Sequence, residues 1–508
     1  MEAAINYART FNEKHGVTGL LVMIGRDYQD GQASNLQLSL PSRNIGVSGR
    51  FSYSYKDRYF AEFNFGYNGS ERFAKSSRFG FFPSYGVGWL VSDEPFFKSS
   101  VIDRLKLRAS YGFIGNDRIG NTREDRFFYL SEVNLRNNGR GYTFGNQFDN
   151  FTPGVSISRY ANPQVTWELA EKVNLGLETS LFNSAVALTI DAFHETRSNI
   201  LQDRQDVPST LGLAAGLQTN VGEVKAWGLD GSLDINHSFN KDTWLTGRGT
   251  YTYTDNEFTI FEEPNYAAID APWRSRIGDN VSQSFGYVAE RLFIDDEDAI
   301  NSPTQLTGAP GVDYGAGDIK YVDLNGDGQI TELDRTAIGN PTVPKITYGF
   351  GLSAGHKRWD LNIFFQGLDQ TSFLVNPRNV GPFINTAVGG ARGENALLQH
   401  IADNHWSLQN NDPYAQWPRL SLDPVSNNEI ASSYWLRNGS FLRLKQVEVG
   451  FNLIDENNDF GLRTLRLYAT GTNLHVWSKF KQWDPELRGN GYNYPLQQVI
   501  NLGVQIEF

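Results

Sequence analysis

The stretch PLQQVINLGVQIEF, residues 495–508, decides the fold class. From Val499 onward, apolar side chains at 500, 502, 504, 506 and 508 alternate with a largely polar set at 499, 501, 503, 505 and 507. Because successive strand side chains point to opposite faces, this pattern predicts a strand with one apolar face. The stretch ends on an aromatic residue, Phe508. If the strand had no neighbour, the backbone N–H and C=O groups along its edge would lack hydrogen-bond partners. Closure into a membrane barrel, apolar outside and polar inside, is one solution.

The composition is compatible with a membrane barrel and argues against several other classes of protein. The chain has 508 residues, no Cys, 50 Gly and 13% aromatic residues, and no apolar run is long enough for a transmembrane helix. The formal charge of −12 argues against a nucleic-acid partner. The absence of Cys excludes a disulfide framework and thiolate metal sites. The first residues, MEAAINYARTFNEKHG, do not read as a signal peptide, so we expect the start of an exported protein to be missing.

About fifteen segments show the same alternation, most of them as long as a tilted membrane strand of roughly 10 residues or slightly more. In 104–113, for example, apolar side chains at odd positions oppose Lys106, Arg108 and Ser110. The alternation changes phase within 440–453, which predicts either a β-bulge or a strand that leaves the bilayer partway. The predicted strands are 2–12, 16–25, 45–55, 58–67, 80–91, 104–113, 170–182, 185–196, 224–237, 242–254, 345–356, 358–368, 440–453, 463–474 and 496–508.

The connections alternate between short and long, as in outer-membrane barrels with short periplasmic turns and long outer loops. The first and last predicted strands then both run towards the periplasm, which requires an odd number of strands. A single-chain barrel has an even number, so we expect the C-terminal part of a larger barrel. Parity also places the alternating segment 283–293 inside an outer loop. The longest loops are 114–169, 255–344 and 369–439.

Several stretches carry a family resemblance. They are DRYFAEFNFGYNGSERFAKSSRFGFFPSYGVGWLVSDEPFF (57–97), LKLRASYGFIGNDRIG (105–120), DIKYVDLNGDGQITELDRTAIGNPTVPKITYGFG (318–351), SSYWLRNGSFLRLKQVEVGFNL (432–453) and LRLYATGTNLHVWSKFKQWDPEL (465–487). Together, in this order, they resemble the SusC-like, or RagA-like, TonB-dependent transporters of Bacteroidota.

The resemblance implies an all-β fold, a transmembrane antiparallel β-barrel of about 22 strands plugged by an N-terminal domain. About fifteen of those strands fall in this chain, and we expect the plug domain to be absent from it. The resemblance further implies import of oligosaccharides or oligopeptides across the outer membrane. The implied partners are a SusD-like surface lipoprotein and the TonB complex, the latter acting through the missing N-terminal part. Phe508 resembles the terminal aromatic residue that the outer-membrane assembly machinery recognises.

The segment DLNGDGQITELD, 323–334, follows the calcium-loop pattern, in which oxygen ligands stand at positions 1, 3, 5, 7 and 12 and Gly at position 6. Position 12 is Asp in place of the bidentate Glu, and the flanks do not read as helices. A turn rich in Gly and Asp without metal is the alternative. The predicted Ca²⁺ ligands are Asp323, Asn325, Asp327, the Gln329 carbonyl and Asp334.

The long loops contain aromatic residues among polar neighbours, and such rings can stack on sugar faces. Packing of the loops or a place at the membrane interface is the alternative for each of them. Trp406 and Trp417 are the predicted substrate contacts. The others are Trp273, Tyr414, Tyr434 and Trp435.

No motif predicts catalysis, because the seven His are scattered and neither a nucleophile elbow nor a P-loop is present. We therefore expect no enzyme. The polar positions of the strands are instead candidates for the barrel lumen: Arg50, Glu62, Asn64, Lys106, Arg108, Lys172, Glu178, Asp360 and Gln366.

Two other functions fit parts of the sequence. The first is a passive, porin-like pore, in which these strands close alone or with a second chain. The second is a soluble calcium-dependent carbohydrate-binding β protein, which should have loops of similar length at both ends of its strands.

Overall fold

The computed structural model describes residues 1–33, 36–120, 126–383, 395–422, 424–454 and 463–507. Phe508 therefore lies outside the described residues. The chain divides into two compact units. The N-terminal unit comprises Met1–Leu229, Asp255–Pro264 and Arg276–Gly278, and the C-terminal unit comprises Asp230–Thr254, Asn265–Ser275 and Asp279–Phe508. No helix among the described residues is both long and apolar enough to cross a bilayer.

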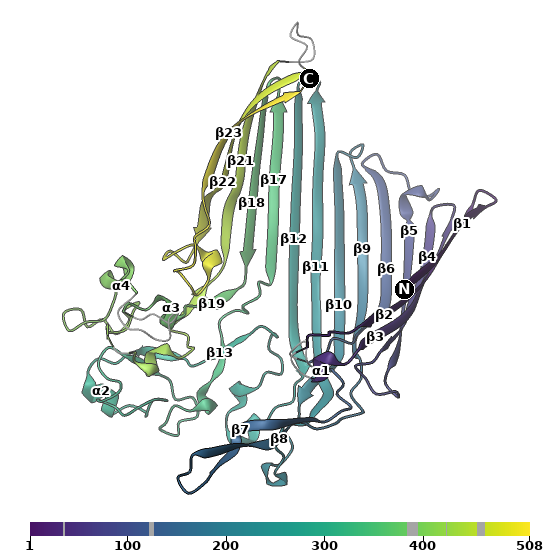
Figure 1. The fold of residues 1–508 in the computed structure, drawn as a ribbon. Coiled ribbons are helices and arrows are strands. Elements are labelled where there is room, and N and C mark those ends of the chain that lie inside the picture. The colour runs from purple at the N-terminus through teal and green to yellow at the C-terminus, as the bar shows by residue number, and fades with distance from the viewer. Residues whose placement is uncertain (34–35, 121–125, 384–394, 423, 455–462, 508) are drawn as a thin grey trace. The chain divides into compact units, whose positions relative to one another are not determined.

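The framework is a sheet of 15 strands, in which each strand neighbours the next one of the set along the chain (Figure 1). Every register that is defined within it is antiparallel, as in β6 with β9 and β17 with β18. The strands are β1 (Glu2–Phe11), β2 (His15–Tyr28), β3 (Ser42–Tyr55), β4 (Tyr59–Ser70), β5 (Phe79–Leu90), β6 (Ile102–Asn116), β9 (Glu168–Leu181), β10 (Val186–Asp203), β11 (Gln218–Asn240), β12 (Thr243–Ile260), β17 (Ile346–His356), β18 (Trp359–Asp369), β21 (Phe441–Ile454), β22 (Thr464–Ser478) and β23 (Val499–Glu507).

Each predicted strand corresponds to one strand of this sheet, so the all-β, antiparallel expectation is confirmed. The largest differences in length are at β11 and β10, which extend beyond the predicted 224–237 and 185–196. The extensions contain Gly, Glu, Asp and Asn. Because these residues have low strand propensity, the sequence did not predict the extensions as strand.

The change of phase in β21 is a β-bulge. Leu444 pairs with Phe365 of β18, and Gln446 pairs with the adjacent Phe364, so Lys445 is the extra residue. One inserted residue switches every later side chain to the other face, because the side-chain period of a strand is two. The bulge accounts for the apolar set that is even at Leu444 and odd from Val447 onward.

Tight turns connect one end of the hairpins. Between β3 and β4, both Lys56 and Asp57 have positive φ angles, of 52° and 49°. Positive φ at both central residues defines the type I′ turn, whose twist matches that of paired strands. This short connection is therefore a hairpin turn.

The long loops contain strands that the sequence did not reveal. The loop 114–169 holds the hairpin β7 (Glu132–Phe144) and β8 (Asn150–Arg159), whose register is irregular and whose side chains are largely exposed. Exposed strands need no apolar face, so periodicity does not mark them. The segment 283–293 lies in a loop, as parity predicted, but it forms two strands, β13 (Ser284–Gly286) and β14 (Ala289–Leu292). Their partners are β16 (Thr336–Ile338) and β15 (Ile319–Tyr321).

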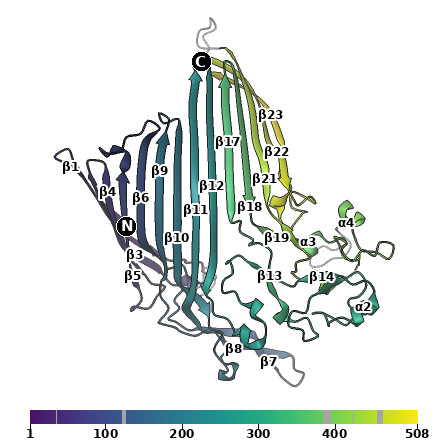
Figure 2. The ribbon, with the colours of Figure 1, turned by 180° about the vertical axis from the view of Figure 1, so that it is seen from behind.

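In the C-terminal unit the loops pack into a folded layer at one end of β17, β18 and β21, visible from both sides in Figures 1 and 2. A hydrophobic core inside this layer joins residues of 287–330, 373–435 and Phe480. The layer also contains the strand pair β19 (Ser372–Leu374) and β20 (Leu436–Asn438) and the helices α2 (Asp296–Ile300), α3 (Pro377–Val380) and α4 (Gln399–Asp403). The short helix α1 (Leu36–Ser39) belongs to the N-terminal unit.

Candidate functional site

The polar face of the sheet is built from ion pairs between neighbouring strands. Arg50 of β3 and Glu62 of β4 are 2.6 Å apart between Nη2 and Oε2. Ser52 and Asn64 also donate to the Glu62 carboxylate, at 2.9 and 2.8 Å. Three of the predicted lumen residues thus form a single cluster.

A second cluster spans three strands. Arg108 of β6 lies 2.9 Å from the carboxylate of Glu178 on β9 and 2.6 Å from that of Asp191 on β10. Lys106 also approaches Glu178, at 3.8 Å. The register places Gly176 of β9 between Arg108 and Asp191. Because Gly176 has no side chain, the Arg108 guanidinium reaches across β9 to β10.

A third cluster follows along β9 and β10. Lys172 pairs with Glu195 at 2.8 Å, and Arg197 pairs with Glu195 at 3.0 Å and with Glu168 at 3.3 Å. Each cation in these clusters therefore has a carboxylate partner on a neighbouring strand.

The C-terminal unit repeats the arrangement. Arg466 of β22 contacts Asp360 of β18 and lies 2.7 Å from Glu448 of β21. Thr470 donates to the same Glu448 carboxylate at 3.1 Å. Gln366 stands six positions after Asp360 on β18 and shares its face, half-buried.

The sequence did not single out Asp191, Glu195, Glu448 or Arg466. Each stands in the polar phase of its strand, which is a usable signal. Their partners could not be named, because pairing depends on the register between strands.

The polar face of the N-terminal unit encloses a cavity of about 660 Å³. Its wall includes Arg50, Glu62, Lys106, Arg108 and Asn174. The wall presents paired charges, hydroxyls and amides, which can exchange hydrogen bonds with a polar solute.

The opposite face is apolar and open. Leu175, beside Asn174 on β9, is 58% exposed, and Leu502 on β23 is 84% exposed. Aromatic side chains flank the short turns, and all of them are exposed by more than a third: Phe11, Tyr59, Trp89, Phe182, Phe239, Trp244 and Trp359. Aromatic rings at the ends of strands with one apolar face are typical of the aromatic girdles of membrane barrels.

The predicted calcium loop, 323–334, follows β15 and ends with the 3-10 helix Glu332–Asp334. The Asp323 carboxylate accepts from the amides of Gly326 and Gly328, both at 2.8 Å, and the Asp327 carboxylate accepts from the amide of Gln329 at 2.8 Å. Asn325 donates to Asp327 at 2.9 Å. These contacts close the loop on itself.

Asp334, the predicted last ligand, is fully buried. Its carboxylate accepts from the amides of Leu324 and Thr331, at 2.8 and 2.7 Å, and completes a capping box with Thr331. Among the described residues no three acidic or imidazole side chains are gathered in a metal-binding arrangement. The role of the loop in binding metal stays a prediction.

Trp406 and Trp417 are not exposed, contrary to the expectation from their polar neighbours. Their side chains are 5% and 8% exposed and belong to the hydrophobic core of the loop layer. Trp417 packs edge-on against Trp435, with ring centroids 4.8 Å apart. The rings are buried because segments distant in the sequence cover them, and contact with a substrate stays a prediction.

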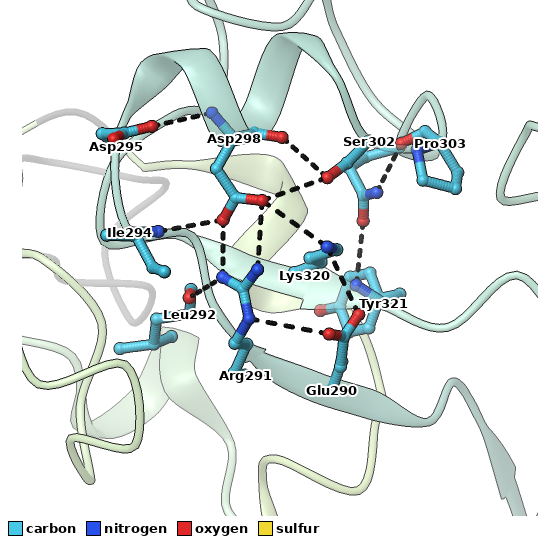
Figure 3. A network of polar contacts seen from close by, with 11 residues as sticks. Glu290, Arg291, Leu292, Ile294, Asp295, Asp298, Ser302, Pro303, Lys320 and Tyr321 are labelled. Atoms are coloured by element: carbon cyan, nitrogen blue, oxygen red, sulfur yellow. Dashed lines mark hydrogen bonds and ion pairs between the residues drawn. The ribbon is translucent and has the colours of Figure 1, made fainter.

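A polar network fixes the loop strand β14 to α2 and β15 (Figure 3). Arg291 lies 2.5 Å from the Asp298 carboxylate, and Lys320 lies 3.6 Å from it. The hydrogen bonds from the Arg291 guanidinium lower the pKa of Asp298 to about 2. Ile294 also donates its amide to this carboxylate, at 3.1 Å, so the network holds the loop backbone.

Asp318 is a second anchor, and it is fully buried. Its carboxylate accepts from Arg419 at 2.9 Å and from Asn428 at 2.8 Å. Burial raises the pKa of Asp318, and the nearby Arg419 guanidinium opposes that rise. The ion pair ties the start of β15 to a segment about a hundred residues later.

Residues 5–380 match the family model described as TonB dependent receptor-like, beta-barrel. The chain belongs to this family. The TonB-dependent receptor P26 of Formosa agariphila is 29% identical over the whole chain and 53% of its own length. The TonB-dependent receptor SusC of Bacteroides thetaiotaomicron is 26% identical over 93% of the chain and 44% of its own length. The chain thus spans about half the length of these relatives.

A solved peptide transporter has the same fold. The RagAB peptide transporter matches over the whole chain with a TM-score of 0.69 and 22% identity, and the chain covers 55% of it. The resemblance to SusC-like and RagA-like proteins is therefore confirmed.

Membership of the TonB-dependent receptor family assigns the two faces of the sheet. These proteins reside in the outer membrane, so the apolar face meets lipid and the polar face lines the interior. The aromatic residues at the short turns then lie at the membrane–water interface.

Proposed function

We propose that this chain forms the barrel of a TonB-dependent importer that carries oligosaccharides or oligopeptides across the outer membrane. The observation that carries the proposal is the polar face, where charged side chains of neighbouring strands are paired. A wall of this kind is wetted, and each of its clusters contains both signs of charge. Such a wall suits solutes that carry many hydroxyl or amide groups.

The proposed mechanism involves binding and gating and makes or breaks no covalent bond. The TonB complex supplies the energy through a part of the protein outside this chain. A SusD-like surface lipoprotein covers the long loops and captures the solute. The names of the relatives support this partnership, since SusC and the RagAB peptide transporter are among them.

The loop layer of the C-terminal unit supports the docking of such a lipoprotein. Its hydrophobic core and the Arg291–Asp298 and Arg419–Asp318 ion pairs make it a folded layer in place of separate loops. A preorganised surface loses less conformational entropy on binding than flexible loops do.

We also propose that the loop 323–334 binds Ca²⁺ in a structural role. The support is the spacing of Asp323, Asn325 and Asp327 and the positive φ angle of Gly328, 84°, at position 6. The carboxylates of Asp323 and Asp327 already point into the loop backbone.

Uptake into cells that produce the whole protein tests the proposed function. Fluorescent oligosaccharides and oligopeptides should accumulate in cells with TonB and not in cells without it. Accumulation of either that is independent of TonB would support the passive pore. No accumulation of any oligomer would contradict import.

A further inference from the structure

A cavity of about 520 Å³ lies between two long loops of the C-terminal unit. Three segments form it: 414–416, 434–438 and 479–482. Its volume falls within the range of small-molecule sites, roughly 300–1,000 Å³. The side chains that matter for its chemistry are Tyr414, Gln416, Tyr434, Arg437, Lys479 and Lys481.

The cavity wall carries positive charge without a carboxylate partner. Arg437 donates through Nη1 to the carbonyl oxygens of Tyr434 and Leu436, at 2.7 and 3.0 Å. Within the described part of the chain no carboxylate forms an ion pair with Arg437, Lys479 or Lys481. Burial lowers the pKa of the Arg437 guanidinium, which is partly buried and donates to carbonyl oxygens.

The acidic residues near the cavity in the sequence have other partners. Asp484 and Glu486 both pair with Arg443, at 2.7 Å each. Asp412 accepts a hydrogen bond from the amide of Tyr414 at 2.9 Å, and its charge adds to burial in raising the pKa of Tyr434. An anion that entered the cavity would compensate a half-buried charge that the fold leaves open.

The loop that carries the lysines is held in place by its own core residue. Phe480 is 6% exposed and packs against Phe373 and Trp483, with ring centroids 5.2 and 4.9 Å apart. Lys479 and Lys481 on either side of it are exposed. The two ammonium groups are therefore presented to solvent from a fixed backbone.

Aromatic rings and amides complete the wall. The Tyr414 side chain is 72% exposed, and the Tyr434 hydroxyl donates to the Ala415 carbonyl at 2.8 Å, which fixes the second ring. Flat rings stack on the apolar faces of sugars, and the side-chain amides of Gln416 and Gln482 can both donate to and accept from hydroxyls. Rings, amides and cations together favour a sugar that carries an acidic group.

We propose that this cavity binds a carboxylate or sulfate group of an acidic oligosaccharide, with Arg437, Lys479 and Lys481 around the anion. The inference rests on the proposed import function and names the class of substrate. Arg437 gives the directional contact, because its planar guanidinium matches the geometry of an oxyanion. The two lysines add attraction that weakens with salt.

Equilibrium binding to the purified whole protein in detergent tests the proposal. The probes are hexagalacturonate, its uncharged methyl ester and an acidic hexapeptide. We expect hexagalacturonate to bind at least 10-fold more tightly than the ester and to bind more weakly as salt is raised. The double variant K479Q/K481Q should weaken hexagalacturonate about 10-fold and leave the ester unchanged.

Arg437→Gln should cause the largest loss, and Arg437→Lys should recover part of it if the charge matters. The exposed Lys241, in a short turn of the same unit, provides the control, and K241Q should bind like the unaltered protein. Equal binding of hexagalacturonate and its ester, tighter binding of the acidic peptide, or no effect of K479Q/K481Q would each overturn the proposal. TonB-dependent uptake that continues with any of these results leaves the import function standing.

Discussion

Arg108 on β6 and Asp191 on β10 form an ion pair of 2.6 Å across the intervening strand β9. The register places Gly176 of β9 beside both residues. A Cβ atom at Gly176 would lie 2.7 Å from the side chain of Arg108 and 2.8 Å from that of Asp191. The glycine thus allows the Arg108 guanidinium to form ion pairs with carboxylates on two strands, β9 and β10. Ion pairs between strands account for the paired charges of the polar face.

Substitution Gly176→Leu should break the ion pair between Arg108 and Asp191. The added side chain occupies the path of the guanidinium, and we expect a loss of about 2 to 4 kcal/mol from overpacking and the lost ion pair. Urea unfolding of the protein in lipid vesicles measures it. Gly249→Leu is the control, because nothing lies within 4 Å of a Cβ at Gly249. Equal losses for both variants would show that the ion pair contributes nothing specific.

The Asp360–Arg466–Glu448 cluster should be costly to open. Arg466→Gln leaves two carboxylates facing each other where their side chains are only about a quarter exposed, 25% and 23%, and we expect a loss of about 3 kcal/mol. The same change at Arg248, whose pair with Asp234 is 73% and 48% exposed, should cost less than about 1 kcal/mol. Adding Asp360→Asn to Arg466→Gln should restore stability. A further loss in that double variant would contradict the assignment.

The Arg291–Asp298 network should make the loop layer sensitive to acid. The pKa of Asp298 is about 2 in the folded protein and about 3.9 when unfolded, so its stabilising effect is complete above about pH 4 and is lost as the pH falls towards 2. The difference corresponds to about 2.6 kcal/mol. Asp298→Asn should therefore raise hydrogen exchange in 289–321 at pH 7 and have little effect near pH 2.

Glu297→Gln, an exposed change on the same helix α2, is the control for that experiment. It should leave the exchange rates of 289–321 unchanged at both pH values. An effect of Asp298→Asn that persisted undiminished near pH 2 would show that it does not arise from the charge of the carboxylate.

Terbium luminescence tests the proposed calcium loop. The Trp273 indole donates to the Leu333 carbonyl at 2.7 Å, so it lies close enough to the loop to sensitise bound Tb³⁺. We expect a Trp-sensitised signal that Ca²⁺ displaces and that the variant Asp323→Asn/Asp327→Asn lacks. Asp313→Asn, outside the motif, should keep it. A signal retained in the double variant would place the ion elsewhere.

The strands could be predicted because their pattern is local. The change of phase within 440–453 predicted either a bulge or a strand that leaves the bilayer, and the structure has the bulge, at Lys445. The ion-pair partners could not be predicted in the same way. Asp191 and Arg108 are 83 residues apart in the chain and meet only because β6, β9 and β10 adopt one register.

The loops were harder to predict for a different reason. Trp406 stands among polar residues, yet it is buried beside Gly317, and a Cβ atom there would lie 2.2 Å from its ring. Burial of this kind depends on which distant segments meet, and no local period encodes it. The exposed hairpin β7–β8 was missed because strands without a buried face carry little alternation.

Neighbouring residues of one strand face water and lipid in turn. Because the chain contains no Cys, Asn174→Cys and Leu175→Cys can each carry a single spin label. In lipid vesicles we expect the label at 174 to collide with a water-soluble nickel complex and the label at 175 to collide with oxygen dissolved in the bilayer. Equal accessibility of both labels to the nickel complex would contradict the barrel assignment.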